Sequence, residues 1–222
     1  MGSNISVTLS GLSLTGDDAS NYSSTLPSGT TADITAKTLT ATADAADKTY
    51  DGTTTATVTL TLSGVVGSDS VSSTNGATFS QSNVGTGITA TVNSITLTGD
   101  DAGNYTISSG QTDTAAITAK ALTISGITAS NKTYDGDNTA TIDYSSAVFT
   151  GLVSGDTVTV TATGTFSDAN VGTGKTVTLS ETTGGADEGN YSITTQGTTT
   201  ANITTKALTY TVDASDKTYD GT

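Results

Sequence analysis

The amino-acid sequence predicts an all-β fold in which small β-modules, either β-sandwiches or β-grasp-like sheets, follow one another end to end as an elongated rod. The 222 residues include 54 threonines and 27 serines, and Thr and Val favour extended backbone because a branched Cβ restricts χ1. Apolar residues alternate with threonine in several stretches, which is the period of a strand with one buried face. Short motifs also recur in constant order at one period, which is typical of a tandem array.

Four motifs define the repeat. Lys-Thr-Tyr-Asp-Gly occurs three times, with its tyrosines 84 and 85 residues apart, at residues 48–52, 132–136 and 217–221. Asn-Tyr follows the same period at residues 21–22, 104–105 and 190–191. Ile-Thr-Ala-Lys occurs at residues 34–37 and 117–120 and, with Thr in its third place, at residues 203–206. Asn-Val-Gly-Thr-Gly occurs at residues 83–87 and 170–174.

The register of these motifs sets the expected domain boundaries. Two complete repeats are expected at residues 38–120 and 121–206. Residues 4–37 match the C-terminal half of a preceding repeat, and residues 207–222 match the start of a following one. We therefore expect the chain to be an excerpt of a longer array, with residues 1–3 as an expression scar.

Strands are expected wherever apolar residues alternate with hydroxyl-bearing ones. After the first two Asp-Gly steps the alternating residues are Ala56, Val58, Leu60 and Leu62, then Ala140, Ile142 and Tyr144. After the two Val-Gly-Thr-Gly motifs they are Ala90 and Val92, then Val177 and Leu179. These patterns predict half-buried antiparallel strands. A further strand is expected from Ile117 to Ile124, crossing from one repeat into the next.

The connections carry ordinary turn residues. The Tyr-Asp-Gly step is predicted to be a hairpin turn, because Asp-Gly tolerates the positive φ angles of a type I′ turn. The stretches 64–69 and 151–156 are compatible with a short helical turn, and the sequence leaves that alternative open. Asn-Val-Gly-Thr-Gly has glycine spacing reminiscent of a phosphate loop, but it lacks the Lys-Ser/Thr pair, so we interpret it as a turn.

Aromatic residues are the expected core anchors, because each one buries about 150–250 Å². In the first complete repeat they are Tyr50, Phe79 and Tyr105, and in the second they are Tyr134, Phe166 and Tyr191. The chain has no cysteine, so the core and the sheet hydrogen bonds have to hold each module together without a disulfide.

Composition excludes several classes of function. With 21 acidic and 7 basic side chains the net charge is −14, which repels phosphate backbones and anionic lipids, so no nucleic-acid partner is expected. No apolar run is long enough to insert into a membrane. The chain lacks His and Cys, so thiol, triad and zinc chemistries lose their central groups. We expect that the protein is not an enzyme.

The acidic turn beside each Asn-Tyr pair is the candidate metal site. Clustered carboxylate and amide oxygens on a turn suit calcium, which takes six to eight oxygen ligands. Asp and Asn are also ordinary turn formers, so a purely structural role is the competing interpretation. The candidate ligands are Asp17, Asp18 and Asn21, then Asp100, Asp101 and Asn104, and finally Asp187, Glu188 and Asn190. No other cofactor is expected.

The ordered motifs resemble the YDG-type tandem repeat domain of large bacterial surface and secreted adhesins, including filamentous-haemagglutinin-like exoproteins. The resemblance covers residues 5–222 and departs from the pattern at the third acidic turn, residues 185–190. It implies an extracellular location at the bacterial surface and a β-rich module repeated as a stalk. It implies no catalytic residues.

Two functional classes remain open. The first is a structural stalk or spacer that extends an adhesive region for cell adhesion or biofilm formation, with neighbouring repeats of the same chain as its partners. The second is a repeated binding module, in which each copy contacts a host or cell-surface glycan or protein and avidity supplies the strength. Exposed aromatic residues favour the second class. The few Tyr and Phe residues are expected in the core, so the stalk is the leading interpretation.

Overall fold

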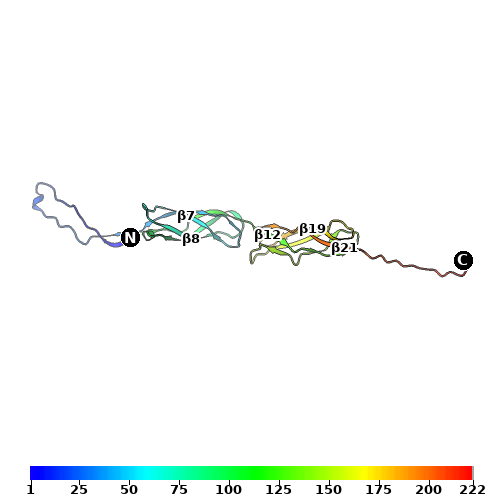
Figure 1. Cartoon of the computed structure of the whole chain (residues 1–222). Coiled ribbons are helices and arrows are strands. Elements are labelled where there is room, and N and C mark those ends of the chain that lie inside the picture. The colour runs from blue at the N-terminus through cyan, green and yellow to red at the C-terminus, as the bar shows by residue number, and fades with distance from the viewer. Residues whose placement is uncertain (222) are drawn as a thin grey trace. The chain divides into compact units, whose positions relative to one another are not determined.

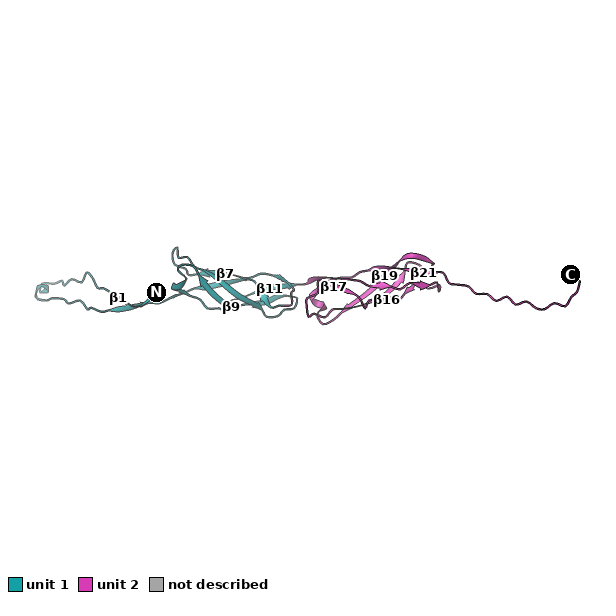
Figure 2. Ribbon diagram, turned by 60° about the horizontal axis from the view of Figure 1, so that its bottom comes forward, with its two compact units in different colours: residues 1–49, 53–118 teal, residues 50–52, 119–222 magenta. Residues whose placement is uncertain are grey.

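The computed structural model describes residues 1–221, and within them the fold is all-β (Figure 1). The helical segments in this range are three short 3-10 turns, Ala19–Asn21 (η1), Ala102–Asn104 (η2) and Glu188–Asn190 (η3). The chain divides into two compact units, shown in different colours in Figure 2. Unit 1 comprises Met1–Thr49 and Thr53–Thr118, and unit 2 comprises Tyr50–Gly52 and the chain from Ala119 onward. The expected tandem all-β modules are therefore confirmed.

Unit 1 is built around one five-stranded mixed sheet. Its order is β5 (Lys48–Thr49), β11 (Thr112–Thr118), β9 (Gly85–Thr98), β8 (Ser72–Phe79) and β6 (Thr55–Ala56). The edge pair β5–β11 is parallel, and the other neighbours are antiparallel. Three two-stranded sheets accompany it: β4 (Thr40–Ala45) with β7 (Val58–Ser63), β3 (Lys37–Thr38) with β10 (Tyr105–Thr106), and β1 (Gly2–Ser6) with β2 (Thr31–Ile34).

Unit 2 repeats this topology. Its five-stranded sheet has the order β14 (Lys132–Thr133), β21 (Thr198–Thr204), β19 (Gly172–Gly184), β18 (Thr159–Phe166) and β15 (Thr139–Ala140). A three-stranded sheet consists of β17 (Val148–Thr150), β12 (Lys120–Ser125) and β20 (Tyr191–Thr194). A two-stranded sheet joins β13 (Thr128–Ala129) to β16 (Ile142–Asp143). The edge strand β14 is again parallel to its neighbour β21.

The core of unit 2 lies between its sheets. Ile124 from β12 packs in one buried cluster with Phe166 from β18 and Val177 from β19. Each fully buried side chain of this size contributes about 1.5–3 kcal/mol to the free energy of unfolding. Residues from all three sheets of unit 2 meet in or against this core, so the unit is a small all-β module built around a mixed sheet.

Five of the six predicted aromatic anchors are buried. They are Tyr50, Phe79, Tyr105, Phe166 and Tyr191. The prediction is wrong for Tyr134, whose side chain is 40% exposed, whereas that of its counterpart Tyr50 is 4% exposed. The physical reason is packing, because the Tyr50 ring lies edge-on against the ring of Tyr191, with 5.6 Å between centroids.

Two predicted strands break where the chain changes sheet. The stretch 117–124 is two strands, since β11 ends at Thr118 in the five-stranded sheet of unit 1 and β12 begins at Lys120 in a separate sheet of unit 2. The stretch 55–62 is likewise divided at Thr57 between β6 and β7, which belong to different sheets. The predicted alternation continues through the break at Thr57, because Ala56 and Val58 are both buried. It changes phase between β11 and β12, where the buried residues are Ile117 and then Leu122 and Ile124.

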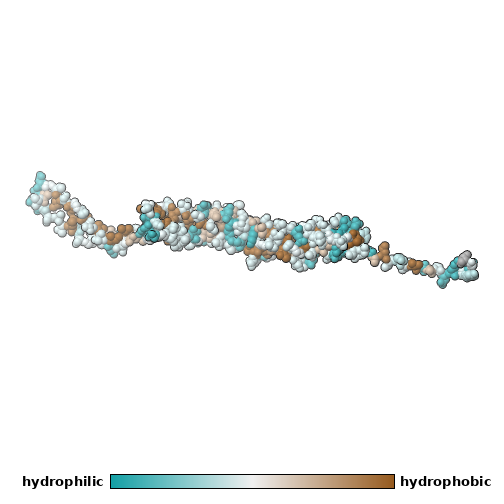
Figure 3. Space-filling view, viewed as in Figure 1, coloured by the Kyte–Doolittle hydropathy of each residue, from teal (hydrophilic) through white to brown (hydrophobic). Residues whose placement is uncertain are grey.

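The N-terminal segment reproduces part of the repeat. The pairing of Ile5 with Ala32 in β1–β2 has the same register as the pairing of Ile88 with Ala115 in β9–β11, 83 residues later. Many apolar side chains of this segment are exposed, and they contribute the brown patches at the start of the chain in Figure 3. They include Ile5, Val7, Leu9, Leu12, Leu14, Tyr22, Leu26 and Ile34.

Candidate functional site

The Tyr-Asp-Gly loop is not a hairpin turn, so that prediction is wrong. The strands on either side of it, β5 and β6, lie at opposite edges of the same sheet, with three other strands between them. A type I′ turn needs positive φ at both central residues, but of Asp51 and Gly52 only the glycine has it, at 78°. The loop is therefore a crossover between sheet edges, and β14 and β15 are joined in the same way.

A lysine holds each crossover loop in place. Lys132 donates from Nζ to the main-chain oxygens of Asp137, at 3.0 Å, and Thr139, at 3.2 Å. The same Nζ lies 2.8 Å from Asp135 Oδ1, and this hydrogen-bonded ion pair lowers the pKa of the Asp135 carboxyl. Lys48 makes the matching bonds in the first repeat, to the main-chain oxygens of Thr53 and Thr55. The Lys of the motif is thus a structural clamp for the loop that follows it.

A tyrosine–aspartate centre lies where the loop residue Tyr50 packs within unit 2. Asp156 Oδ2 accepts hydrogen bonds from the hydroxyl groups of Tyr50, at 2.9 Å, and Tyr191, at 2.5 Å. The main-chain N–H of Val153 donates to the Tyr191 hydroxyl at 2.9 Å. The ideal Cβ position of Gly52 lies 3.1 Å from Cγ1 of Val153, so the glycine permits a close approach here.

Unit 1 contains the same centre without the loop tyrosine. The Tyr105 hydroxyl donates to Asp69 Oδ2 at 2.6 Å and accepts from the main-chain N–H of Val66 at 3.0 Å. Each aspartate closes a turn, since the N–H of Asp69 donates to the oxygen of Val66 and that of Asp156 to the oxygen of Val153. The stretches 64–69 and 151–156 thus contain turns, and no helix is assigned to them.

The electrostatics of these centres favour protonated tyrosines. Burial, followed by the hydrogen bond to Asp156, raises the pKa of Tyr50 to about 12. Burial is also the main cause that raises the pKa of Tyr191, while the hydrogen bond to Asp69 is the main cause for Tyr105. A phenol with a raised pKa is a poor general base near neutral pH. The protonated hydroxyl groups of Tyr105 and Tyr191 therefore serve as hydrogen-bond donors to Asp69 and Asp156.

The predicted acidic-turn residues lie at the three 3-10 turns. Asp101 and Asp187 fasten these turns to the preceding loop, because their Oδ2 atoms accept the main-chain N–H groups of Ser70, at 2.9 Å, and Thr157, at 2.8 Å. Asn104 Oδ1 accepts a hydrogen bond from the N-terminal amino group. Glu188 accepts a hydrogen bond from the Thr183 hydroxyl.

The remaining predicted ligands differ in exposure. Asp17, Asp18 and Asn21 are exposed at the first turn, as is Asp100 at the second, whereas Asn190 is buried at the third. Within residues 1–221 no group of three or more carboxylates is placed so that it could hold a metal ion. Calcium binding at these turns stays a prediction. The hydrogen bonds of Asp101 and Asp187 to main-chain N–H groups show that these two carboxylates have a structural role.

Sequence reasoning missed Asp69 and Asp156, which the structure makes central. Both follow a valine by three residues, in Val66-Gly-Ser-Asp69 and Val153-Ser-Gly-Asp156. This short shared pattern was the available signal. It is weak, because nothing in the sequence indicates that these carboxylates meet the tyrosine of an Asn-Tyr pair more than 30 residues later.

Comparison with known proteins adds one family. The family model described as YDG domain matches residues 35–115 and 118–201. No curated protein and no solved structure shows a significant match to the chain. The structure contains, within its described range, no helix with the length and apolarity needed to span a bilayer.

Proposed function

Since the chain belongs to the YDG domain family, with two tandem copies, we propose that it is a structural spacer of a large bacterial surface or secreted adhesin. In this role each repeat adds length between an anchoring region and an adhesive region, for cell adhesion or biofilm formation, outside the cell. The repeats carry out no catalysis, and their principal partners are neighbouring repeats of the same chain.

The observation that carries the proposal is the use of the polar motif residues for architecture in both repeats. Lys48 and Lys132 clamp their crossover loops, and Asp101 and Asp187 fasten their 3-10 turns. The tyrosine of the Asn-Tyr pair also has a structural contact, since the Tyr105 hydroxyl donates a hydrogen bond to Asp69. These contacts engage the motifs that define the repeat in holding each repeat together, which is what a spacer requires.

The proposal is tested by the length of arrays with different numbers of repeats. Small-angle scattering on proteins with two, three and four repeats should show a maximum dimension that grows by a constant increment, on the order of 30–40 Å per repeat. A matched set with a flexible Gly-Ser linker inserted after Thr118 should show a smaller and variable increment. A maximum dimension that does not rise with repeat number would contradict the spacer role.

A repeated binding module is the second candidate, and one observation favours it. Tyr144 is half exposed and borders a shallow hollow with the hydroxyl-bearing residues Thr161, Thr163, Ser180 and Thr182. An exposed ring beside hydroxyl groups is suited to stacking on a sugar. Position 144 corresponds to Leu60 in the first repeat, so this hollow is not repeated, and avidity from identical sites does not follow.

Glycan-array binding distinguishes the two candidates. The spacer proposal predicts no saturable binding by this chain, with Tyr144→Ala indistinguishable from the parent. Binding that is lost on Tyr144→Ala, with an unchanged melting temperature, would favour the binding module.

Calcium dependence is measured separately. If the acidic turns bind calcium, calorimetric titration should give a saturable signal that the double variant Asp101→Asn with Asp187→Asn reduces, leaving only the contribution of the first turn at Asp17 and Asp18. Scattering with and without calcium would then show whether extension depends on the ion. A titration without heat of binding would show that the acidic turns do not bind calcium, and it would leave the spacer proposal unchanged.

A further inference from the structure

We propose that the lysine of the Lys-Thr-Tyr-Asp-Gly motif protects the Asp-Gly step of the same motif from rearranging to isoaspartate. The contacts that carry this inference are made by Lys132 and Asp135, within unit 2. Asp135-Gly136 is then a site of slow, non-enzymatic modification, and Lys132 is the residue that controls its rate. Such protection concerns the chemical durability of the main chain, and it stands independently of the spacer role.

The rearrangement needs only the two residues and water. The main-chain nitrogen of Gly136 bonds to Cγ of Asp135, and one carboxyl oxygen leaves as water with the proton of the acid and the proton of the amide. Water then opens the cyclic imide. When the bond between the nitrogen and the main-chain carbonyl carbon of Asp135 breaks, the chain continues through Cγ and the residue is isoaspartate. Glycine favours the first step, because without a Cβ its nitrogen can approach the carboxyl carbon closely.

The ionised carboxyl group resists this attack, because ring closure requires the neutral acid. Lys132 Nζ lies 2.8 Å from Asp135 Oδ1, and the main-chain N–H of Asp137 donates to the same oxygen at 3.0 Å. These contacts, that of Lys132 first, lower the pKa of the Asp135 carboxyl. At neutral pH the neutral acid is therefore a smaller fraction than it would be without the lysine.

The lysine is itself held in place. An ammonium group has three N–H donors, and Lys132 Nζ also reaches the main-chain oxygens of Asp137 and Thr139, at 3.0 and 3.2 Å. Its side chain is 18% exposed, whereas that of Asp135 is 53% exposed. The Asp135 carboxylate is thus paired with an anchored cation rather than with a freely moving side chain.

The shape of the loop requires the labile dipeptide. Gly136 has a φ angle of 86°, in the left-handed region where another residue would be strained. Asp135 Oδ1 accepts the N–H of the residue two positions later, which is a common role of aspartate in a turn. Because both residues serve the loop, protection has to come from a third residue.

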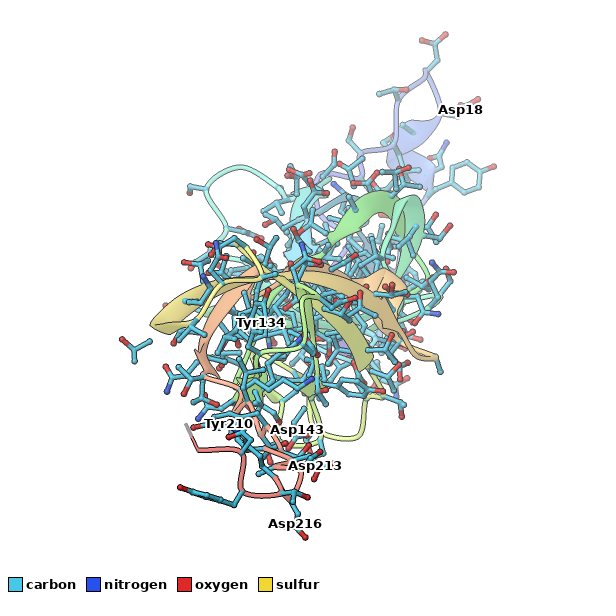
Figure 4. The ribbon with its side chains drawn as sticks, turned by 90° about the vertical axis from the view of Figure 1, so that its right-hand side faces the viewer. Asp18, Tyr134, Asp143, Tyr210, Asp213 and Asp216 are labelled. Atoms are coloured by element: carbon cyan, nitrogen blue, oxygen red, sulfur yellow. The ribbon has the colours of Figure 1, made fainter. Side chains whose placement is uncertain are left out.

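The sequence places a lysine at every such step. Asp-Gly occurs at residues 51–52, 135–136 and 220–221, and each time a lysine stands three residues before the aspartate. The chain has only seven basic residues, so this placement is not a consequence of a lysine-rich composition. Figure 4 labels Tyr134, which stands between the lysine and the aspartate of the second copy.

Isoaspartate would disturb the loop in which it forms. The main chain would gain a methylene group between β14 and β15, and the free carboxyl would move to Cα. It would then no longer stand where Lys132 and the N–H of Asp137 bind it. The crossover between the edges of the five-stranded sheet would lose these contacts.

Isoaspartate formation in the whole chain is the first test. After prolonged incubation at neutral pH, peptides that contain Asp135 are quantified by mass spectrometry, with fragmentation that distinguishes isoaspartate from aspartate. Lys132→Met should raise the rate at Asp135 by about 3- to 10-fold, because a higher pKa increases the neutral fraction at a fixed pH. Asp51, in the other copy of the motif, is read from the same digest and should not change.

Lys175→Met is the matched control. It removes the same charge from the same unit, at a lysine whose Nζ lies 2.6 Å from Asp168 Oδ1 and whose side chain is 11% exposed. Asp168 precedes an alanine, so this variant should leave the rate at Asp135 unchanged. Lys132→Arg keeps a cation that can pair with a carboxylate, so it should retain most of the protection. Circular dichroism verifies that each variant is folded during the incubation.

The titration of Asp135 is the second test, because it separates the charge of Lys132 from its bonds to the loop. The charged groups that act on Asp135 are Lys132 and the carboxylate of Asp137, whose own pKa is lowered by its hydrogen bond to Thr139. In Lys132→Met, NMR of the labelled carboxyl carbon should show the pKa of Asp135 rising toward its ordinary value of 3.8. Lys175→Met should leave it unchanged.

The proposal fails if the parent, Lys132→Met and Lys175→Met form isoaspartate at Asp135 at the same rate. It also fails if both methionine variants form it equally fast and faster than the parent, because the effect would then follow net charge and not the clamp. A faster rate in Lys132→Met with an unchanged pKa of Asp135 would likewise contradict it, since the lysine would then act only by holding the loop. None of these outcomes alters the length test of the spacer.

Discussion

Unit 1 and unit 2 share their topology but differ at the tyrosine–aspartate centre. Asp156 in unit 2 accepts hydrogen bonds from two tyrosine hydroxyl groups, whereas Asp69 in unit 1 accepts one from Tyr105. The extra donor, Tyr50, belongs by sequence to the first repeat and by contacts to unit 2. The comparison teaches that the sequence repeat and the structural unit are out of phase at the Tyr-Asp-Gly loop.

The two cores also differ in side-chain volume at two neighbouring positions, and the two differences offset each other. Ala56 pairs with Ala77 in unit 1, and Ala140 pairs with Gly164 in unit 2, so Ala77 and Gly164 are equivalent positions. A Cβ at Gly164 would lie 2.5 Å from Cδ1 of Ile142. The equivalent of Ile142 in unit 1 is the smaller Val58. Volume added at one position is thus removed at its neighbour, as close packing requires.

The largest difference in stability between the two units is expected when the aspartate of the tyrosine–aspartate centre is removed. Asp156→Ala should lower the free energy of unfolding of unit 2 by about 3 kcal/mol, because two tyrosine hydroxyl groups lose a charged acceptor. Asp69→Ala should lower that of unit 1 by about half as much, since one hydroxyl group is affected. Hydrogen exchange read separately on peptides from each unit measures both. Equal losses of unfolding free energy in the two units would contradict the inference that Tyr50 adds stability to the centre of unit 2.

A smaller effect is expected from overpacking the core of unit 2. Gly164→Ala should destabilise unit 2 by about 2 kcal/mol, because its new methyl group meets Ile142 and Val177. The second substitution Ile142→Val should restore most of the loss, since it recreates the pair found in unit 1. Thermal denaturation of the single and double variants measures the rescue. An additive double variant would show that the two positions are not coupled.

The lysine clamps should contribute about 1 kcal/mol each. Lys132→Met keeps the apolar stem but removes the bonds to Asp135, Asp137 and Thr139, so the crossover loop of the second repeat should exchange its amides faster. Lys48→Met should have a similar effect on the first loop. Amide exchange of peptides that span each loop is the measurement. Unchanged exchange in both would show that the loops hold their shape without the clamp.

The smallest expected effect is on the titration of Tyr50, which tyrosinate absorbance follows. The folded-state pKa of Tyr50, about 12, lies above the ordinary value of 10, so the stability that this group contributes is fully present below pH 10. It is lost as the pH rises from 10 to 12. Tyrosinate absorbance at 295 nm should therefore show a late component that Tyr50→Phe reduces. In concentrated urea the late component should vanish for both proteins, and a late component that Tyr50→Phe leaves unchanged would refute the assignment.

Much of the fold could be predicted because it depends on patterns between residues that are close in the sequence. The alternation at Ala56 and Val58 and at Ala90 and Val92 correctly marks buried faces, since side chains alternate along any strand. The period of the motifs correctly marks two modules. Which strands pair could not be predicted in the same way, because the pairing partners of β5 and β6 are set by contacts distant in sequence.

The candidate site was less predictable than the fold. The acidic turns were visible as clusters of Asp and Asn, but the pattern does not distinguish a ligand from a brace such as Asp101. Tyr50 and Tyr134 stand in the same five-residue motif, yet one is buried and the other is exposed. Local sequence cannot express that difference, because it depends on what packs against the motif.

The sequence by itself determined the all-β class, the two repeats and the hydroxyl-rich solvent faces of the strands, since these follow from residue type and period. Only the tertiary structure decided that Tyr-Asp-Gly crosses between sheet edges and that Asp69 and Asp156 receive tyrosine hydroxyl groups. The physical reason is the range of the interactions. Strand propensity and alternation act between neighbours in the chain, whereas a buried hydrogen bond is formed by groups that only the folded backbone brings together.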